Sequence, residues 1–410
     1  MKLPCIQCKG RDPSNCGRTF CPIIAKYQSQ VRSTPKTAKK DYFGPAPTPF
    51  VGHYGYPKVN VGILSATEQV NDKDNLDNPR RWGKENTPFH ELIDLRTSLV
   101  NANFKSNIKR PAKQVALAQE VAMARRPVEV EINLNKTPKP RLTSDPYSAP
   151  TGPNAKLEKV KLTENPKIPT KVEKVFDDTD LKAADAMKYL YKSNFDENYL
   201  TRILSIGTLG KKLNRRLVPT RWSITATDDI VCKDVIKELY DYKEIDYKAY
   251  FGSHLGNYFL ILTMPGPWSY ELFETYQPHA SWNAFNEEPS CTTDYEGPFG
   301  RKDYVKETAG GYYASRLPIV EHLKKIKRNG SVIVLRVITG EYAVPMGVWV
   351  VREAARKAIN SKPLVFSDEK LLLDFATMKL KKFFNIDPTA FFKKSILLKE
   401  RKQPRLRNFF

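Results

Sequence analysis

Four cysteines near the N-terminus have the residue type and spacing of a metal site. They are Cys5, Cys8, Cys16 and Cys21, and they follow the pattern C-x2-C-x7-C-x4-C. A C-x2-C turn is tight enough to aim two thiolates at one ion, and a second cysteine pair completes a tetrahedron. A segment this short has no core of its own, so metal binding would supply its folding free energy. The spacing predicts one structural Zn2+, with an iron–sulfur cluster, disulfides or free thiols as the alternatives.

The last eight residues carry a second pattern, Q-x-x-L-x-x-F-F, formed by Gln403, Leu406, Phe409 and Phe410. One 3₁₀ or helical turn places Leu406 and Phe409 side by side, and Phe410 extends the same apolar face. Burial of each such side chain is worth roughly 1.5–3 kcal/mol. The four residues resemble the PIP box, the short peptide that docks on the sliding clamp PCNA. The resemblance implies that PCNA brings this chain to DNA; the alternative is a tail packed on its own domain.

A third candidate is the densest cluster of basic and aromatic residues in the chain. Its members are Lys211, Lys212, Arg215, Arg216, Arg221 and Trp222. Cations provide affinity for phosphates, and an aromatic ring can stack on an exposed or unpaired base. We therefore expect DNA contact here. The alternative is a solvated loop whose arginines pair with the carboxylates that follow.

Two further patterns raise the question of catalysis. Asp228 and Asp229 could hold metal ions for phosphodiester cleavage, but capping of a helix explains them more simply. Gly310 and Gly311 could let the backbone approach a phosphate, although a glycine pair is a weak pattern. No catalytic residue is assigned. The sequence leaves two classes open: a DNA-binding factor without chemistry of its own, and a repair enzyme acting on nucleotides, such as a nuclease, with its site in 207–229 and 310–316.

The composition favours a polyanionic partner. Lys and Arg number 67 against 45 for Asp and Glu, which gives a net charge of +22 at pH 7. Nucleic acid is the simplest such partner, and a lysine-rich solubilising surface is the alternative. No window has the length and apolarity of a membrane-spanning helix, and the start shows no signal-peptide pattern. We expect a monomeric, cytoplasmic, nucleoid-associated protein that does not contact membrane.

The elements that must position these residues indicate an α+β protein. The expected parts are a zinc-binding segment (1–27), an α/β region (28–135), a Pro- and Lys-rich linker or surface wrap (136–171), an α+β domain (172–400) and a flexible clamp-binding tail (401–410). Prolines in 28–50 indicate a linker at the start of the α/β region. Successive β-rich runs at 244–251, 255–264, 267–276 and 280–286 predict an antiparallel sheet in the second half, followed by helices. Strands are predicted over 128–134, 218–227 and 331–338, and helices over roughly 179–192 and 197–206. Asp228 and Asp229 are expected to open a further helix.

Several of these stretches together resemble the archaeal Nre family of DNA-repair proteins. They are the four-cysteine cluster, 53–57, 211–229, 310–317, 345–358 and the terminal Q-x-x-L-x-x-F-F. The resemblance spans nearly the whole chain, and its specific parts are the cysteines and the terminal motif. It implies a clamp-associated role in the repair of damaged DNA in an archaeal cell. It transfers no catalytic mechanism to particular residues.

Overall fold

The computed structural model describes residues 8–11, 21–140, 148–278, 280, 282–283 and 285–402. The chain forms two compact units. The barrel unit comprises residues 20–231, and the sheet unit comprises residues 1–19 and 232–410. The division therefore falls between Val231 and Cys232, not in the Pro- and Lys-rich stretch 136–171. The reason is that this stretch contributes a strand to the centre of the first sheet.

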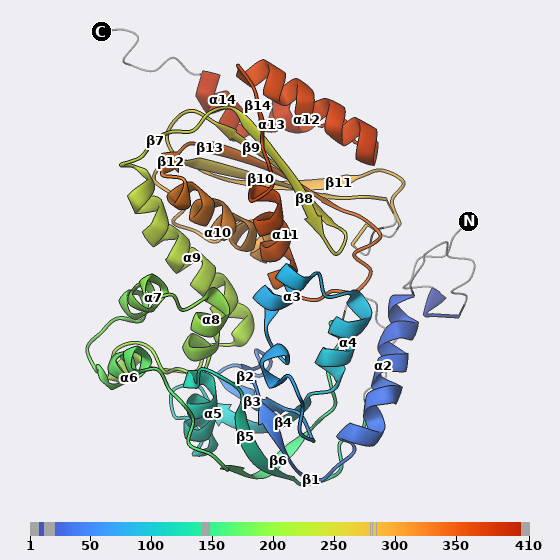
Figure 1. Ribbon diagram of the computed structural model, residues 1–410, viewed down its shortest axis with the longest axis vertical. Helices are drawn as coiled ribbons and strands as arrows, with labels where there is room; N and C mark the ends of the chain where they lie inside the picture. Colours follow the sequence, from blue (N-terminus) through green and yellow to red (C-terminus); the bar gives the residue numbers. More distant parts are fainter. Residues whose placement is uncertain are drawn as a thin grey trace. The chain divides into compact units, whose positions relative to one another are not determined.

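Six strands form the sheet of the barrel unit, in the order β1-β5-β6-β4-β3-β2 (Figure 1). They are β1 (Asp41–Ala46), β2 (Thr48–Val51), β3 (Lys58–Ser65), β4 (Val100–Asn107), β5 (Val128–Leu134) and β6 (Asn154–Leu162). Strands β1 and β2 stand at opposite ends of this order, yet only Pro47 separates them in the chain. One bent strand thus pairs with β5 along its first half and with β3 along its second half. The sheet therefore closes on itself as a barrel.

The inward faces of these strands explain why the strands form. In β5 the residues Val128, Val130, Ile132 and Leu134 are buried and alternate with more exposed polar residues. This alternation is the period of a strand with one buried face, so the predicted strand over 128–134 is confirmed. In β3 the buried set Val59, Val61 and Ile63 follows the same period.

The linker predicted for residues 28–50 is wrong. The structure has helix α2 (Pro22–Thr37) there, followed by β1 and β2. Pro35 lies inside the last turn of α2, and Pro45 and Pro49 lie inside the strands. Proline lacks only the backbone donor, so its carbonyl can still accept. Pro45 O accepts a hydrogen bond from Ala66 N at 3.0 Å, which fastens β1 beside the end of β3.

Helices complete the barrel unit. They are α3 (Pro79–Glu85), α4 (Phe89–Thr97), α5 (Gln114–Met123), α6 (Thr170–Asp177), α7 (Ala183–Lys192), α8 (Glu197–Ser205) and the first part of α9 (Thr220–Leu239), with short 3₁₀ turns η1 (Lys73–Asn75) and η2 (Lys212–Asn214). Asp196 accepts from the backbone N–H groups of Asn198 and Tyr199 and so caps α8. The sequence places α7 and α8 within a few residues of their observed bounds.

Helix α9 replaces the strand predicted over 218–227. The N–H groups of Trp222 and Ser223 both donate to Pro219 O, at 2.8 and 3.0 Å, and this starts the helix at Thr220. Its buried residues Ser223, Thr227 and Val231 recur every four positions, the period of a helix face. Because the residues of that face include small polar ones, the helical period does not appear in the spacing of hydrophobic residues. Asp228 and Asp229 lie within α9, so neither opens the helix, and the capping interpretation is wrong.

The sheet unit is built on a second sheet, in the order β11-β10-β13-β9-β8-β14. Its strands are β8 (Lys248–His254), β9 (Asn257–Met264), β10 (Ser269–Tyr276), β11 (Ser290–Glu296), β13 (Ser331–Ile338) and β14 (Leu364–Val365). The β10–β13 pair is parallel, and the other neighbours are antiparallel. A two-residue pair, β7 (Lys243–Glu244) with β12 (Arg328–Asn329), lies outside this sheet. The antiparallel sheet expected in the second half is present, with one parallel pair added.

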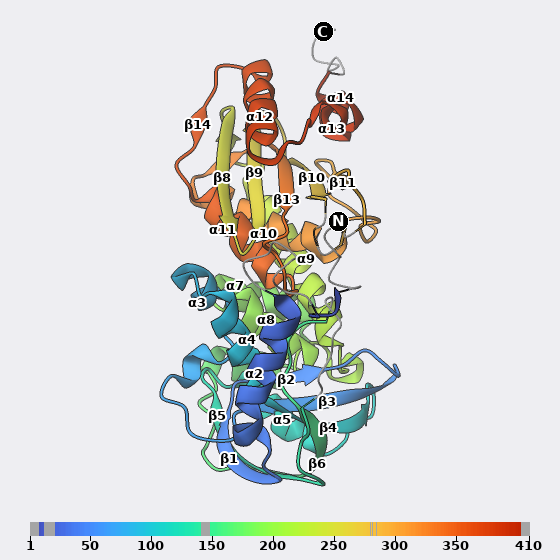
Figure 2. The ribbon, with the colours of Figure 1, turned by 90° about the vertical axis from the view of Figure 1, so that its right-hand side faces the viewer.

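Helices cover both faces of this sheet, as Figure 2 shows. The helices are α10 (Ala309–Lys325), α11 (Trp349–Ile359), α12 (Glu369–Phe384), α13 (Thr389–Lys394) and α14 (Ile396–Lys402). Leu260 and Leu335 belong to the core packed with Leu372 of α12, while Tyr270 faces Tyr312 of α10. Burial on both faces explains why β9 and β13 are mostly apolar and do not alternate apolar with polar residues. The mixed α/β body and helical C-terminal part agree with the expected α+β class.

The strand predicted at 280–286 is not formed by the described residues of that stretch. Asn283 there donates through Nδ2 to Tyr276 O at 3.1 Å and to Glu288 O at 2.8 Å. These side-chain bonds hold a turn, and the strand that pairs with β10 begins later, at Ser290.

Candidate nucleic-acid interface

The predicted basic–aromatic cluster lies in the barrel unit, between α8 and the first turn of α9. Lys211, Lys212, Arg216 and Arg221 are exposed, and Trp222 keeps 46% of its surface exposed. Arg215 is half-buried and bonds within its own unit. It donates through Nε to Gly210 O at 2.7 Å and through Nη2 to Asp178 O at 2.8 Å. Burial lowers the pKa of Arg215, and the side chain fastens the segment that carries the other cations.

A second segment, which was not predicted as part of a site, lies beside this cluster. It is the loop between β2 and β3, with His53, Tyr54 and Tyr56. Tyr54 is 78% exposed and Tyr56 48% exposed. The ring of Tyr56 lies 5.2 Å from that of Trp222, and His53 lies 4.1 Å from Tyr54, between centroids. Three aromatic residues in a turn between two strands are the signal that would have indicated it.

Three hydrogen bonds hold the loop, the end of β4 and the start of α9 together. Val51 N donates to Thr220 Oγ1 at 2.9 Å. Ile108 N donates to Pro57 O at 3.1 Å, and Leu217 N donates to Ile108 O at 3.0 Å. The three segments therefore form one surface, which we call the aromatic–basic surface. It consists of 53–58, 105–110 and 211–222.

The aromatic–basic surface is strongly positive. Lys58, Lys105, Lys109 and Arg110 are exposed on it in addition to the predicted cations. Among the described residues, none of these four, nor Lys211, Lys212, Arg216 or Arg221, has an ion-pair partner. Unpaired cations beside exposed rings suit a polyanion that also presents flat apolar groups.

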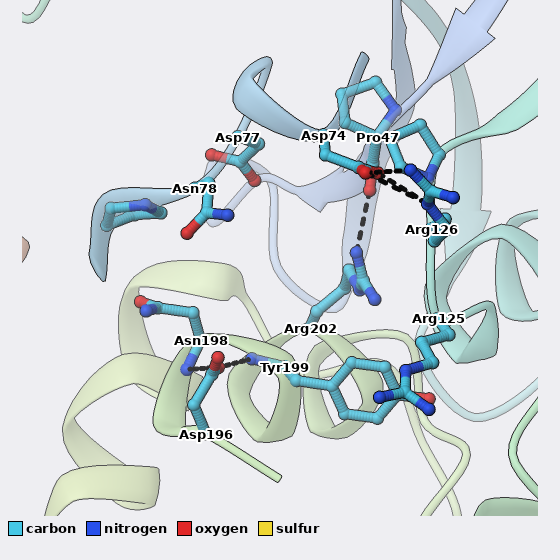
Figure 3. Close-up of a pocket in the computed structure, with 12 residues that line it drawn as sticks. Pro47, Asp74, Asp77, Asn78, Arg125, Arg126, Asp196, Asn198, Tyr199 and Arg202 are labelled. Carbon is cyan, nitrogen blue, oxygen red and sulfur yellow. Dashed lines mark hydrogen bonds and ion pairs between the residues drawn. The ribbon is translucent and has the colours of Figure 1, made fainter. Parts of the chain in front are cut away.

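A pocket of about 390 Å³ lies elsewhere in the barrel unit, between Pro47, the η1–α3 loop and the start of α8 (Figure 3). Arg126 pairs with Asp74, its Nε lying 3.1 and 3.0 Å from the two carboxylate oxygens. Arg202 donates to Pro47 O and to Ala124 O, both at 2.8 Å. Desolvation lowers the pKa of the buried Arg202. These bonds join separate elements of the unit, so the groups that make them have a structural role.

The block 310–316, part of the alternative enzyme site, lies in the sheet unit and packs inward. Arg316 forms a buried ion pair with Glu296, which also accepts from Trp268 Nε1 at 3.0 Å. A Cβ on Gly311 would stand 3.0 Å from both Arg336 Nη1 and Glu274 Oε1, which are partners in a second buried pair. Close packing against this pair thus accounts for Gly311 without a phosphate. Within the described residues, no three or more His, Cys, Asp or Glu side chains gather as metal ligands.

The zinc and clamp predictions fall largely beyond the described residues. Cys5, Cys16, Gln403, Leu406, Phe409 and Phe410 lie outside them. Cys8 is buried and begins a tight turn in which Lys9 and Gly10 have φ of 50° and 81° and Arg11 N donates to Cys8 O at 2.9 Å. Cys21 directly precedes α2. No helix in the described part of the chain is both long enough and apolar enough to cross a membrane.

The chain belongs to the archaeal Nre family. Residues 15–283 match the family part described as archaeal Nre, N-terminal, and residues 296–409 match archaeal Nre, C-terminal. The resemblance drawn from the sequence is therefore confirmed.

Curated relatives extend the match over the whole chain. It is 36% identical over 409 residues to the DNA repair protein NreB of Archaeoglobus fulgidus, covering 99% of this chain and 100% of the relative. It is 39% identical over 373 residues to the DNA repair protein NreA of the same organism, covering 89% and 91%. The DNA repair protein NreA of Haloferax volcanii is 38% identical over 329 residues, covering 78% of each chain. No solved structure matches this chain.

Proposed function

We propose that this protein is a DNA-repair factor that binds DNA through its aromatic–basic surface. The observation that carries the proposal is the group of exposed cations without ion-pair partners, fixed beside Tyr54, Tyr56 and Trp222. The net charge of +22 agrees with a polyanionic partner. The three relatives are all named DNA repair proteins, which supports DNA repair as the process in which this chain binds DNA.

The test is the salt dependence of DNA binding, measured by fluorescence anisotropy. Each phosphate contact contributes roughly 0.7–0.9 to the slope of log K against log salt. Arg216→Ala with Arg221→Ala removes two exposed cations and should weaken binding and reduce the slope by roughly 1.4–1.8. The control, Lys84→Ala with Lys182→Ala, removes the same charge from exposed positions on α3 and before α7. Equal effects of the two double variants would locate the DNA elsewhere.

The proposal includes recruitment by PCNA through Gln403, Leu406, Phe409 and Phe410. Helix α14 ends at Lys402, directly before the motif, and Leu397 and Leu398 are buried in the sheet unit. The peptide thus follows a fixed helix. We expect basic residues beside the motif to attract an acidic surface of the clamp. Lys402 is exposed and available for this, whereas Arg401 pairs with Glu369, Nε to Oε2 at 2.8 Å.

Calorimetry with the purified clamp tests this recruitment. A peptide that orders on binding should reach micromolar affinity, about −8 kcal/mol. Phe409→Ala with Phe410→Ala removes most of the buried apolar area and should abolish the heat of binding. Phe299→Ala is the matched control, because Phe299 is fully exposed in the sheet unit. If the double variant binds the clamp as tightly as the parent chain does, recruitment by PCNA through this motif is refuted.

The last part of the proposal is a structural Zn2+ held by Cys5, Cys8, Cys16 and Cys21. The tight turn after Cys8 and the four-thiolate set fit such an ion. Elemental analysis of the purified protein should find about one zinc per chain. Cys8→Ser should lose it, and Cys291→Ser should keep it. Iron with sulfide in place of zinc would contradict the assignment.

A further inference from the structure

The barrel unit has a chain topology with a known use. Counting β1 and β2 as one bent strand, the first strand pairs with the second (β3) and with the fourth (β5). The third strand, β4, pairs antiparallel with β3 and parallel with the fifth, β6. The fifth pairs antiparallel with the fourth, and helix α5 stands between the third and fourth. This is the arrangement of the OB-fold, which binds oligonucleotides across its second and third strands and the loop between its first and second.

Topology alone assigns no function, so the chemistry of that face decides. Outward residues of β3 and β4 form cross-strand pairs, Lys58 with Asn107 and Asn60 with Lys105, and all four are exposed. The neighbouring β2 adds Phe50, which is 41% exposed and stands opposite Gly62. The face that would contact an oligonucleotide thus carries cations for phosphates, amides for base edges and an aromatic ring.

The loop between the first and second strands provides the stacking groups. It carries Tyr54 and Tyr56, and Tyr56 lies against Trp222. Hydrogen bonds at both ends fix the loop: Gly52 N donates to Asn60 O at 2.8 Å, and Lys58 N donates to Gly55 O at 2.8 Å. Rings held in this way present their faces without first having to be ordered, and every base can stack on such a face.

We infer that the barrel unit is an OB-type module that binds single-stranded or locally unpaired DNA. The inference rests on the proposed DNA binding and adds the class of DNA. In a duplex the faces of the bases are covered by their neighbours, so Tyr54, Tyr56 and Trp222 have nothing to stack on. In a single strand the bases are free, and Phe50, Lys58 and Lys105 continue the track along β2, β3 and β4.

The experiment compares a fluorescein-labelled oligothymidine of about 12 nucleotides, within the usual range of an OB site, with a blunt duplex of the same length. The parent chain should bind the single strand more tightly. Tyr54→Ala and Trp222→Ala should each weaken it about 5- to 100-fold, with duplex affinity nearly unchanged. Tyr189→Ala is the matched control, since Tyr189 is an exposed tyrosine of the same unit on α7. Unchanged thermal melting shows that the variants are folded. Because Tyr54 is exposed, Tyr54→Ala should keep the parental fold.

The possible results distinguish failure of the single-strand module from failure of the proposed DNA binding. Binding to neither DNA refutes the proposed function and the inference together. Equal binding to both, with Tyr54→Ala and Trp222→Ala indistinguishable from Tyr189→Ala, leaves a DNA-binding protein but overturns the single-strand module. A preference for the single strand that disappears in both aromatic variants supports the module.

Discussion

Gly311→Ala tests the structural explanation of the glycine pair in α10. The new Cβ would stand 3.0 Å from Arg336 Nη1 and from Glu274 Oε1, tighter than ordinary contact. Arg336 has little room to move, because its Nε also donates to Asn257 Oδ1 at 3.2 Å and both members of the pair are buried. Overpacking of this kind costs ~1–3 kcal/mol, and the better helix propensity of alanine returns about 1 kcal/mol.

We therefore expect the sheet unit to lose up to about 2 kcal/mol in free energy of unfolding, which lowers Tm by up to roughly 8 °C, measured by calorimetry. Gly340→Ala is the control, because no atom lies within 4 Å of its added Cβ. That variant should be neutral or slightly stabilising, since alanine restricts the unfolded chain. If Gly311→Ala is as stable as Gly340→Ala but binds DNA more weakly, Gly311 serves a ligand and the packing explanation fails.

Two further side chains, His254 and Arg215, should have measurable effects on stability. Burial and the charge of Lys357 lower the pKa of His254 to about 4. The unfolded chain takes up a proton below about pH 6.5 that the folded chain refuses, so stability should fall as pH drops from 6.5 to 4, by up to about 3 kcal/mol. Denaturant titrations should show this fall in the parent and a flatter profile in His254→Gln; equal profiles would contradict it. Arg215→Ala should lower stability by about 1 kcal/mol, because two backbone carbonyls, one of them exposed to water, lose their donor. A variant with parental stability but weaker DNA binding would instead make Arg215 a DNA contact.

Regular elements with a strong period could be predicted from the sequence. The alternation over Val128–Leu134 and the run of Val, Ile and Leu within Ser331–Ile338 each predict a strand at the observed bounds. The buried side chains of such elements are apolar, so the spacing of apolar residues in the sequence indicates which residues point inward. Helix α9 could not be predicted in this way, since Ser223 and Thr227 on its buried face are polar.

The candidate site was found only in part, for a different physical reason. The cations of 211–221 and Trp222 are evident as a local cluster, but their neighbours are not local. Tyr56 reaches Trp222 because Val51 bonds to Thr220 and Pro57 bonds to Ile108. Such contacts depend on the register of distant segments, which composition and spacing do not contain. Barrel closure through the bent strand around Pro47 is hidden for the same reason.

The bent strand around Pro47 also determines when the barrel can close during synthesis. Its first half pairs with β5, from Asp41 opposite Asn133 to Ala46 opposite Val128. The roughly 80 residues between Ala46 and Val128 take about 4 to 16 s to make at ~5–20 residues per second. Until then the strand has no partner on that side, and pairing across such a separation is slow. For several seconds, therefore, the nascent chain exposes a strand edge without its partner strand. Such an edge is a binding site for a chaperone.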